Sequence, residues 1–167
     1  MKWVIFTGTW KLTNAEVERD VREATRKVLS DGDAIITGGA TGVDYFCMDE
    51  CYKLKSLNKL RVILPTKLDF YIQHYHTAYE AGKIDLEACD NLCDILTKIQ
   101  KESPVSVLEM HHKTLTQDEY NERNSEEVKY GDEIYAFQVN NSSGTQDTID
   151  KAGLRGVPTT LHKKYTI

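Results

Sequence analysis

The residues best suited to chemistry lie in two small, polar stretches of the chain. The first follows the apolar run Ala34-Ile35-Ile36-Thr37 and reads Gly38-Gly39-Ala40-Thr41-Gly42-Val43-Asp44. Three glycines within five positions remove the Cβ atoms that would hold a ligand away from the backbone, so bare N–H groups can face it. A helix that begins near Asp44 adds the positive end of its dipole. This stretch predicts a site for an anion such as a phosphate.

The second stretch, Asn140-Asn141-Ser142-Ser143-Gly144-Thr145, follows an apolar run at 133–139 and precedes a predicted helix at about 146–153. Small residues also follow the first apolar run, where the sequence reads Thr7-Gly8-Thr9. In an open parallel sheet, turns at the carboxyl ends of strands can converge on one crevice where the strand order reverses. We therefore expect the two polar stretches to line one ligand site.

Four cysteines form two C-x3-C pairs, Cys47 with Cys51 and Cys89 with Cys93. Each pair falls on one face of a predicted helix, and four thiolates from two helices can hold a zinc ion. Both pairs also lie within apolar stripes, where cysteine usually serves as a small core residue. Zinc loops more often use C-x2-C spacing. We therefore predict core cysteines and no metal site, and no disulfide in a chain without an export signal.

His74 and His76 lie in an aromatic, polar segment with Tyr71, Tyr75 and Tyr79. No carboxylate stands at a spacing that would complete a metal-ligand set. The pattern therefore favours an aromatic cluster at the surface or over a ligand rather than a ligand pair.

The elements that position these residues alternate in type. Apolar runs predict strands at about 3–6, 34–37, 60–65, 105–110, 133–139 and 159–162. Helical spacing predicts helices from the capping box Thr13-Asn14-Ala15-Glu16 to Ser30, at 44–57 and 85–101, from the capping box at Thr116 to Tyr130, and at 146–153. This alternation predicts a three-layer, Rossmann-like α/β fold, with a mostly parallel sheet and helices on both faces.

Composition limits the class of protein. A chain of 167 residues with 40% hydrophobic content fits one domain, residues 1–167, with 66–101 as a helical insertion. Its 21 basic and 26 acidic residues give a net charge of −5 without any basic run, which disfavours nucleic acid as a partner. No apolar stretch approaches the roughly 20 residues of a membrane span, and no signal peptide is visible. We expect a soluble, cytoplasmic protein without a membrane partner.

One ordered set of motifs resembles a known superfamily: Thr7-Gly8, Gly38-Gly39-Ala40-x-Gly42-Val43-Asp44, Arg123-Asn124 and Ser143-Gly144-Thr145. The set is similar to the SMF/LOG-like (SLOG) Rossmann-type superfamily, which joins the DNA-processing-A recombination mediators and the lonely-guy phosphoribohydrolases. The resemblance is to short, stand-alone members and is weakest over 66–101. It implies a single nucleotide-binding domain with no further cofactor.

The resemblance also implies the residues that would contact the ligand. They are Thr7, Gly8, Thr9, Gly38, Gly39, Thr41, Gly42, Asp44, Arg123, Asn124, Ser142, Ser143, Gly144 and Thr145. The planar guanidinium of Arg123 would bind a phosphate, and Asn124 a ribose or a base edge. Three bland alternatives stay open: a helix cap for Asp44, an exposed surface charge for Arg123, and ordinary turn residues for Ser142 and Thr145.

One departure from the superfamily bears on catalysis. Lonely-guy phosphoribohydrolases carry a P-G-G-x-G-T-x-x-E motif, and the position of its glutamate holds Thr148 in this chain. A hydroxyl cannot supply the charge of a carboxylate. Asp147 lies one position earlier, about 100° round the helix, and we expect it to point elsewhere. No catalytic residue is assigned.

Three functions of different class follow. The favoured one is a module that binds a nucleotide or nucleotide-derived ligand, as a sensor or a sequestering protein. The alternative is an N-glycosidic hydrolase or transferase that acts on a nucleoside phosphate, and a single-stranded-DNA-binding protein ranks third. We expect Arg123→Ala and Gly42→Val to abolish stabilisation by the ligand while leaving the fold intact. The helix at 85–101 has an apolar stripe that suits the sheet or a second copy of the chain, so a homo-oligomer stays open.

Overall fold

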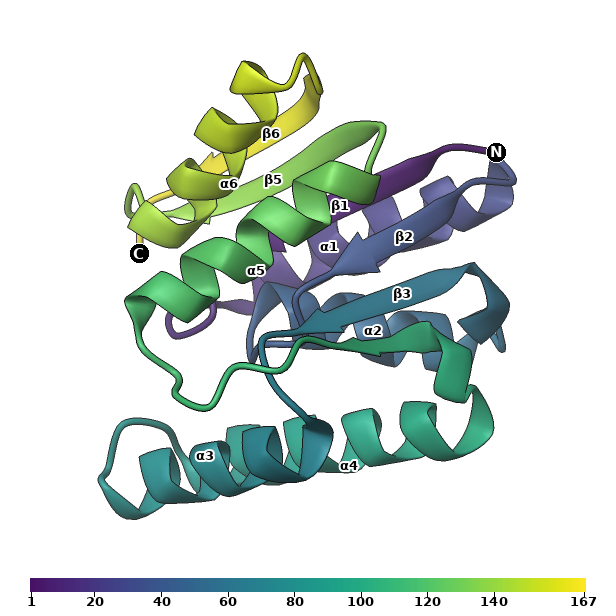
Figure 1. The fold of residues 1–167 in the computed structure, drawn as a ribbon. Helices are drawn as coiled ribbons and strands as arrows, with labels where there is room; N and C mark the ends of the chain where they lie inside the picture. The colour runs from purple at the N-terminus through teal and green to yellow at the C-terminus, as the bar shows by residue number, and fades with distance from the viewer.

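The computed structural model describes all 167 residues and contains one six-stranded sheet (Figure 1). Its strands are β1 (Trp3–Gly8), β2 (Ala34–Thr37), β3 (Leu60–Leu64), β4 (Val107–Glu109), β5 (Glu133–Val139) and β6 (Thr159–Tyr165). Their spatial order is β4-β3-β2-β1-β5-β6, and every neighbouring pair is parallel. The sheet is therefore parallel throughout.

Six helices cover both faces of the sheet. They are α1 (Ala15–Ser30), α2 (Val43–Lys53), α3 (Leu68–Glu80), α4 (Leu86–Glu102), α5 (Gln117–Tyr130) and α6 (Ser143–Leu154). Figure 1 shows α5 and α6 in front of the sheet and α1 and α2 behind it. Helices α3 and α4 lie between β3 and β4 in the sequence and contact each other, and α4 also packs against α2. The predicted three-layer, Rossmann-like α/β fold is confirmed.

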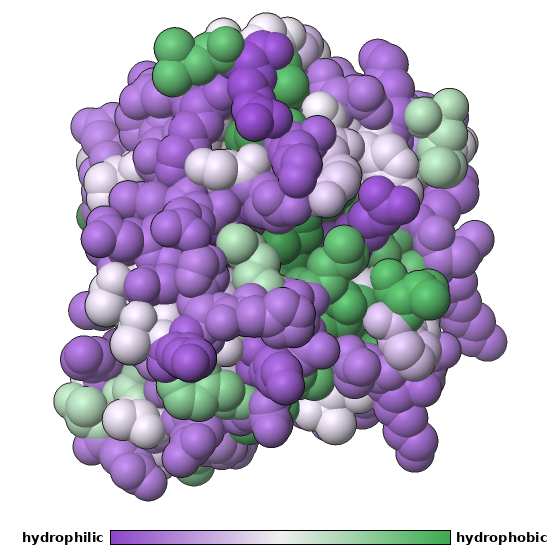
Figure 2. Space-filling model, in the orientation of Figure 1, coloured by the Kyte–Doolittle hydropathy of each residue, from purple (hydrophilic) through white to green (hydrophobic).

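The strands are apolar on both faces because helices cover both. Neighbouring residues of β1 point to opposite sides, so Phe6 joins the larger core cluster, which includes residues of α1, α2 and α4. Ile5 joins a smaller cluster with Val128 of α5 and Ala152 of α6. Figure 2 shows an apolar patch beside α5, over the part of the sheet around β3 that Figure 1 shows uncovered by a helix.

Several element boundaries differ from the sequence-based prediction. Helix α3 was not predicted, and α2 ends at Lys53 rather than at residue 57. Strand β4 begins only at Val107, because Pro104–Ser106 forms a 3-10 turn. Strand β6 continues to Tyr165, whereas β5 has the predicted bounds.

The apolar stripe of α4 packs within the chain. Leu92, Leu96 and Ile99 of this stripe are buried and belong to the larger core cluster. The stripe is therefore not a free surface for a second copy. None of the helices combines the length and the apolar composition needed to cross a membrane.

Candidate functional site

The carboxyl edge of the sheet brings the predicted site segments together. The chain proceeds from β1 to β2, β3 and β4 in one direction, and then returns to place β5 on the other side of β1. The strand order thus reverses between β1 and β5, which is where open α/β sheets usually bind ligands. Because all strands are parallel, the turns after β1, β2 and β5 lie at this same edge.

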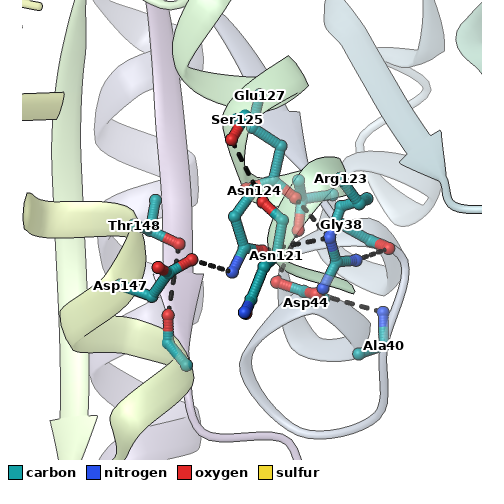
Figure 3. Close-up of polar contacts among 12 residues, drawn as sticks. Gly38, Ala40, Asp44, Asn121, Arg123, Asn124, Ser125, Glu127, Asp147 and Thr148 are labelled. Atoms are coloured by element: carbon teal, nitrogen blue, oxygen red, sulfur yellow. Dashed lines mark hydrogen bonds and ion pairs between the residues drawn. The ribbon is translucent and has the colours of Figure 1, made fainter. Parts of the chain in front are cut away.

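Asp44 holds the glycine-rich turn after β2 in place through hydrogen bonds. Its carboxylate accepts hydrogen bonds from the Thr37 hydroxyl (2.7 Å) and the Ala40 N–H (3.0 Å), and the Gly38 N–H is aimed at it (Figure 3). The expectation of bare amide groups is therefore wrong for Ala40. Asp44 is only 7% exposed, so it holds the turn instead of standing open at the surface.

The glycines of this turn make room for the chain itself. A Cβ atom on Gly38 would collide with the guanidinium of Arg123, and one on Gly42 would collide with the carbonyl oxygen of Thr9. Gly42 also has a φ of +74°, which side chains rarely tolerate. The space that the sequence suggested for a ligand is thus filled, at these two positions, by Arg123 and by the turn after β1.

Arg123 of α5 lies under the turn after β2. Its Nη1 donates to the carbonyl oxygen of Gly38, and its Nε lies 3.1 Å from the Glu127 carboxylate (Figure 3). The guanidinium also lies 5.6 Å from the ring centre of Tyr120. The residue is 8% exposed. Its partners in the chain therefore account for much of its hydrogen-bonding capacity, and contact with a ligand phosphate stays a prediction.

Asp44, Arg123 and Glu127 form a buried charge cluster with two carboxylates for one guanidinium. Burial raises the pKa of Glu127 to about 8; the positive charge of Arg123 opposes this rise and the negative charge of Asp44 adds to it. Burial likewise raises the pKa of Asp44, against the pull of Arg123 and of the hydrogen bonds from Thr37 and Ala40. The cluster therefore retains a proton on Glu127 near neutral pH.

Aromatic residues of α3 cover the charge cluster. The His74 Nε2 lies 3.3 Å from the Tyr120 hydroxyl, and the hydroxyls of Tyr71 and Tyr75 lie 3.5 Å apart. Burial lowers the pKa of His74 and favours its neutral form. The prediction of a surface cluster is therefore wrong for Tyr71 and Tyr75, which are buried in the larger core cluster, whereas His74 contacts Tyr120 of α5.

The turn after β5 differs because it leaves its donors open. Ser142 is the N-cap residue of α6, yet its hydroxyl donates to the Thr145 hydroxyl (2.7 Å) and accepts from no backbone amide. The N–H groups of Ser143, Gly144 and Thr145 have no acceptor in the chain, and the first turn of α6 holds no acidic residue. Gly144 is exposed, and a Cβ atom there would meet nothing within 4 Å. Unlike the other turn, this one has space and donors for an anion.

Asn124 connects α5 to α6. Its Nδ2 donates to the Asp147 carboxylate (3.0 Å), which also accepts from Lys151 Nζ (2.6 Å; Figure 3). Asp147 thus points to other partners than Thr148 does, as expected, but one of these partners is the predicted site residue Asn124. Thr148, at the position of the superfamily's glutamate, is buried and donates to the Gly144 carbonyl (3.3 Å). Helix α5 thus contacts the turn after β2 through Arg123 and helix α6 through Asn124.

A cavity of about 320 Å³ adjoins the turns after β1 and β2. Its lining includes Trp10, Lys11, Thr41 and, from the loop between α3 and α4, Lys83. Trp10 is 47% exposed although it is large and apolar. The ligand contacts predicted from the sequence end at Thr9, the residue before Trp10. The residues of the β5–α6 turn are not part of the lining.

Comparisons with known proteins add information on the fold. No protein-family model matches the chain, and no curated protein matches it. Among solved structures, DNA processing protein A from Helicobacter pylori, studied for its single-stranded DNA binding mode, is similar with a TM-score of 0.67 at 15% identity. DNA processing protein A from Streptococcus pneumoniae gives 0.61 at 12%, and the structural-genomics target TM1055 gives 0.58 at 16%.

The matches cover 99%, 99% and 95% of this chain, respectively. The chain spans 64% of the Helicobacter protein, 50% of the Streptococcus protein and 72% of TM1055. At such identities the likeness is one of fold. It agrees with the fold that the superfamily resemblance implied.

Proposed function

We propose that the protein binds a nucleotide or nucleotide-derived ligand at the carboxyl edge of its sheet, as a sensor or a sequestering module. The phosphate lies at the N-terminus of α6, where it accepts hydrogen bonds from the N–H groups of Ser143, Gly144 and Thr145. The observation that carries this proposal is that these three donors have no acceptor in the chain. The positive end of the helix dipole favours an anion at the same place.

Gly144 supports the proposal independently of these donors. Crowding within the chain explains the absence of a side chain at Gly38 and Gly42, but it explains nothing at Gly144, whose surroundings are open. Gly144 also has no positive φ that would call for glycine. A helix with glycine instead of alanine in its first turn is less stable. A ligand that must approach the backbone closely gives a reason for the glycine.

The remainder of the ligand extends across the turn after β1 toward Trp10. The exposed indole offers a flat apolar face for a base, and Lys11 and Lys83 in the lining of the same cavity offer positive charge for further phosphates. Strand β1 lies between β2 and β5, so its turn separates this cavity from α6. A ligand that reaches both is of dinucleotide size rather than a single phosphate.

Thermal unfolding with a ligand panel tests this proposal. Because a ligand that binds only the folded state stabilises it by mass action, we expect a rise in Tm with a member of a panel of nucleoside phosphates, ADP-ribose species and cyclic dinucleotides. Gly144→Glu should abolish the rise by filling the space and repelling the phosphate. Gly153→Glu, at the other end of α6 and equally uncrowded, should leave it unchanged. An identical rise in wild type and Gly144→Glu would refute the phosphate position.

A second candidate, cleavage at an N-glycosidic bond, has one observation in its favour. The Asp147 carboxylate lies within hydrogen-bond distance of Asn124, so the region between α5 and α6 does contain a carboxylate. It also lies 2.6 Å from the ammonium group of Lys151, and a carboxylate is the kind of group that stabilises an oxocarbenium-like centre. Release of free base from nucleoside monophosphates by wild type but not by Asp147→Asn would favour this candidate. If wild type releases no base, the function as a binding module is favoured.

A further inference from the structure

One histidine and two cysteines converge between helices α3 and α4. Cys89 and Cys93 lie one turn apart on α4, and His76 of α3 faces them. The side-chain ligand atoms of the three all lie within 4.8 Å of one another, and His76 Nδ1 lies 3.7 Å from Cys89 Sγ. No other group of three such side chains in the chain is equally close.

The donor set matches the chemistry of zinc. Zinc binds thiolate sulfur at about 2.3 Å and imidazole nitrogen at about 2.0–2.1 Å in tetrahedral geometry. Two ligands at a tetrahedral angle are then roughly 3.5–3.8 Å apart. The distance between His76 and Cys89 already falls in this range, and the Cys93 sulfur lies within 4.8 Å of both ligand atoms. Thiolate and imidazole together favour zinc over the hard cations magnesium and calcium.

We propose that His76, Cys89 and Cys93 bind one zinc ion. His76 is exposed, so the fourth coordination position faces solvent and takes water or another small ligand. On binding, both thiols release their protons to solvent, and the two thiolates balance the charge of the ion. This site differs from the one weighed on sequence grounds, because it uses a single cysteine pair and adds a histidine from a neighbouring helix.

The zinc ion would tie α3 to α4. The loop between these helices, residues 81–85, contributes Lys83 and three neighbouring residues to the cavity beside Trp10. Binding of zinc to the folded chain stabilises it and fixes this wall of the cavity. The inference rests on the three side chains alone and does not depend on the proposed ligand.

Metal titration of the full chain tests the inference. Reduced protein, freed of metal with a chelator, is titrated with zinc chloride, and with cobalt(II) as a spectroscopic probe. We expect one equivalent of zinc per chain, a rise in Tm, and the thiolate charge-transfer and tetrahedral ligand-field bands of cobalt. His76→Ala should weaken binding by at least about ten-fold and change the cobalt spectrum. His76 is exposed, so this variant should keep the fold.

Two control variants test whether zinc binding is specific to the proposed site. His111→Ala removes another exposed histidine and should bind zinc as wild type does. Cys51→Ser alters the other C-x3-C pair, which is fully buried, and should also retain the cobalt bands. The inference is overturned if wild type binds no zinc, or if His76→Ala and Cys93→Ser bind it as tightly as wild type does.

Discussion

At the scale of single residues, the sequence singled out several groups that lie close together but did not predict their partners. Arg123, Asp44 and Gly38 were all candidates for ligand contact, and the structure joins them to one another. Nothing in the sequence singled out Glu127, since an acidic residue on a charged helix usually faces solvent. Its burial depends on Arg123 one turn away and on the open space at Gly38 in another element. Such long-range pairings cannot be read from local spacing.

The raised pKa of Glu127 makes stability depend on pH. Between its ordinary value of 4.5 and its folded value of about 8, this carboxyl holds a proton in the folded state but not in the unfolded state. Its contribution to stability is therefore complete below about pH 4.5 and is lost as pH rises toward 8. We expect Glu127→Gln to gain stability relative to wild type over this range, by at most about 1.4 kcal/mol per pH unit.

Urea unfolding of both proteins at pH 5, 6, 7 and 8 measures this difference. Taking the difference between the two proteins cancels the titration of the histidines and of other shared groups. A difference that stays constant with pH would contradict the assignment of a raised pKa to Glu127.

Arg123→Ala should destabilise the fold rather than act as a clean probe of ligand binding. It removes the guanidinium that contacts the Glu127 side chain and stabilises the buried Asp44 carboxylate, and a buried charge that loses its partner costs about 3–5 kcal/mol. Gly42→Val should also destabilise, through its clash with Thr9. Arg155→Ala, at an exposed position, is the matched control, and chemical denaturation is the measurement. Wild-type stability of Arg123→Ala would show that the charge cluster has no structural role.

At the scale of elements, segments with strongly periodic apolar residues were predicted well, and the segment of mixed polar and aromatic residues was not. Strand β5 and helices α1, α4 and α5 were predicted closely, because apolar spacing and capping residues agreed. Only the capping box at Thr116 forms as predicted, whereas Asn14 alone caps α1. Helix α3 was missed because its buried residues are mainly Tyr71 and Tyr75, whose hydroxyls and histidine neighbours made the segment look polar. Its partners on α5 and α4 decide its structure.

Helix α6 carries the element-scale prediction. Gly144→Ala and Gly153→Ala place a methyl group at two uncrowded positions, and both should raise the free energy of unfolding by about 0.5–1 kcal/mol. Only Gly144→Ala should lower the affinity for the ligand that stabilises wild type, because only that methyl group faces the proposed phosphate. Denaturation with and without ligand separates the two effects. Equal ligand affinity in both variants would argue that the ligand does not approach α6.

At the scale of the whole molecule, the alternation of strands and helices predicted which segments meet at one edge. It did not predict which turn stays open, since that depends on Asp44 folding back onto one turn while the first turn of α6 holds no acidic residue. The glycine-rich turn, the stronger motif by composition, mainly holds the molecule together. The less glycine-rich turn before α6 is the one that keeps free N–H donors for the proposed anion.

The charge of the whole chain distinguishes a small ligand from single-stranded DNA. A net charge of −5 without any basic run disfavours tight, salt-dependent binding to a polyanion. We expect fluorescence anisotropy with a labelled oligonucleotide to show binding weaker than that of the stabilising small ligand at physiological salt. Tight binding with a steep dependence on salt would instead favour a function like the one studied in the Helicobacter protein.

The central claim is that the open amide groups of α6 bind a phosphate, and amide-resolved NMR tests it most directly. Uniformly ¹⁵N-labelled protein is titrated with the nucleotide-derived ligand that stabilises it most. We expect the largest shifts at the N–H signals of Ser143, Gly144 and Thr145, together with the indole signal of Trp10 but not that of Trp3. Shifts that spare these amides and gather at the hollow near Tyr52 and Ser103, at the amino ends of the strands, would contradict it.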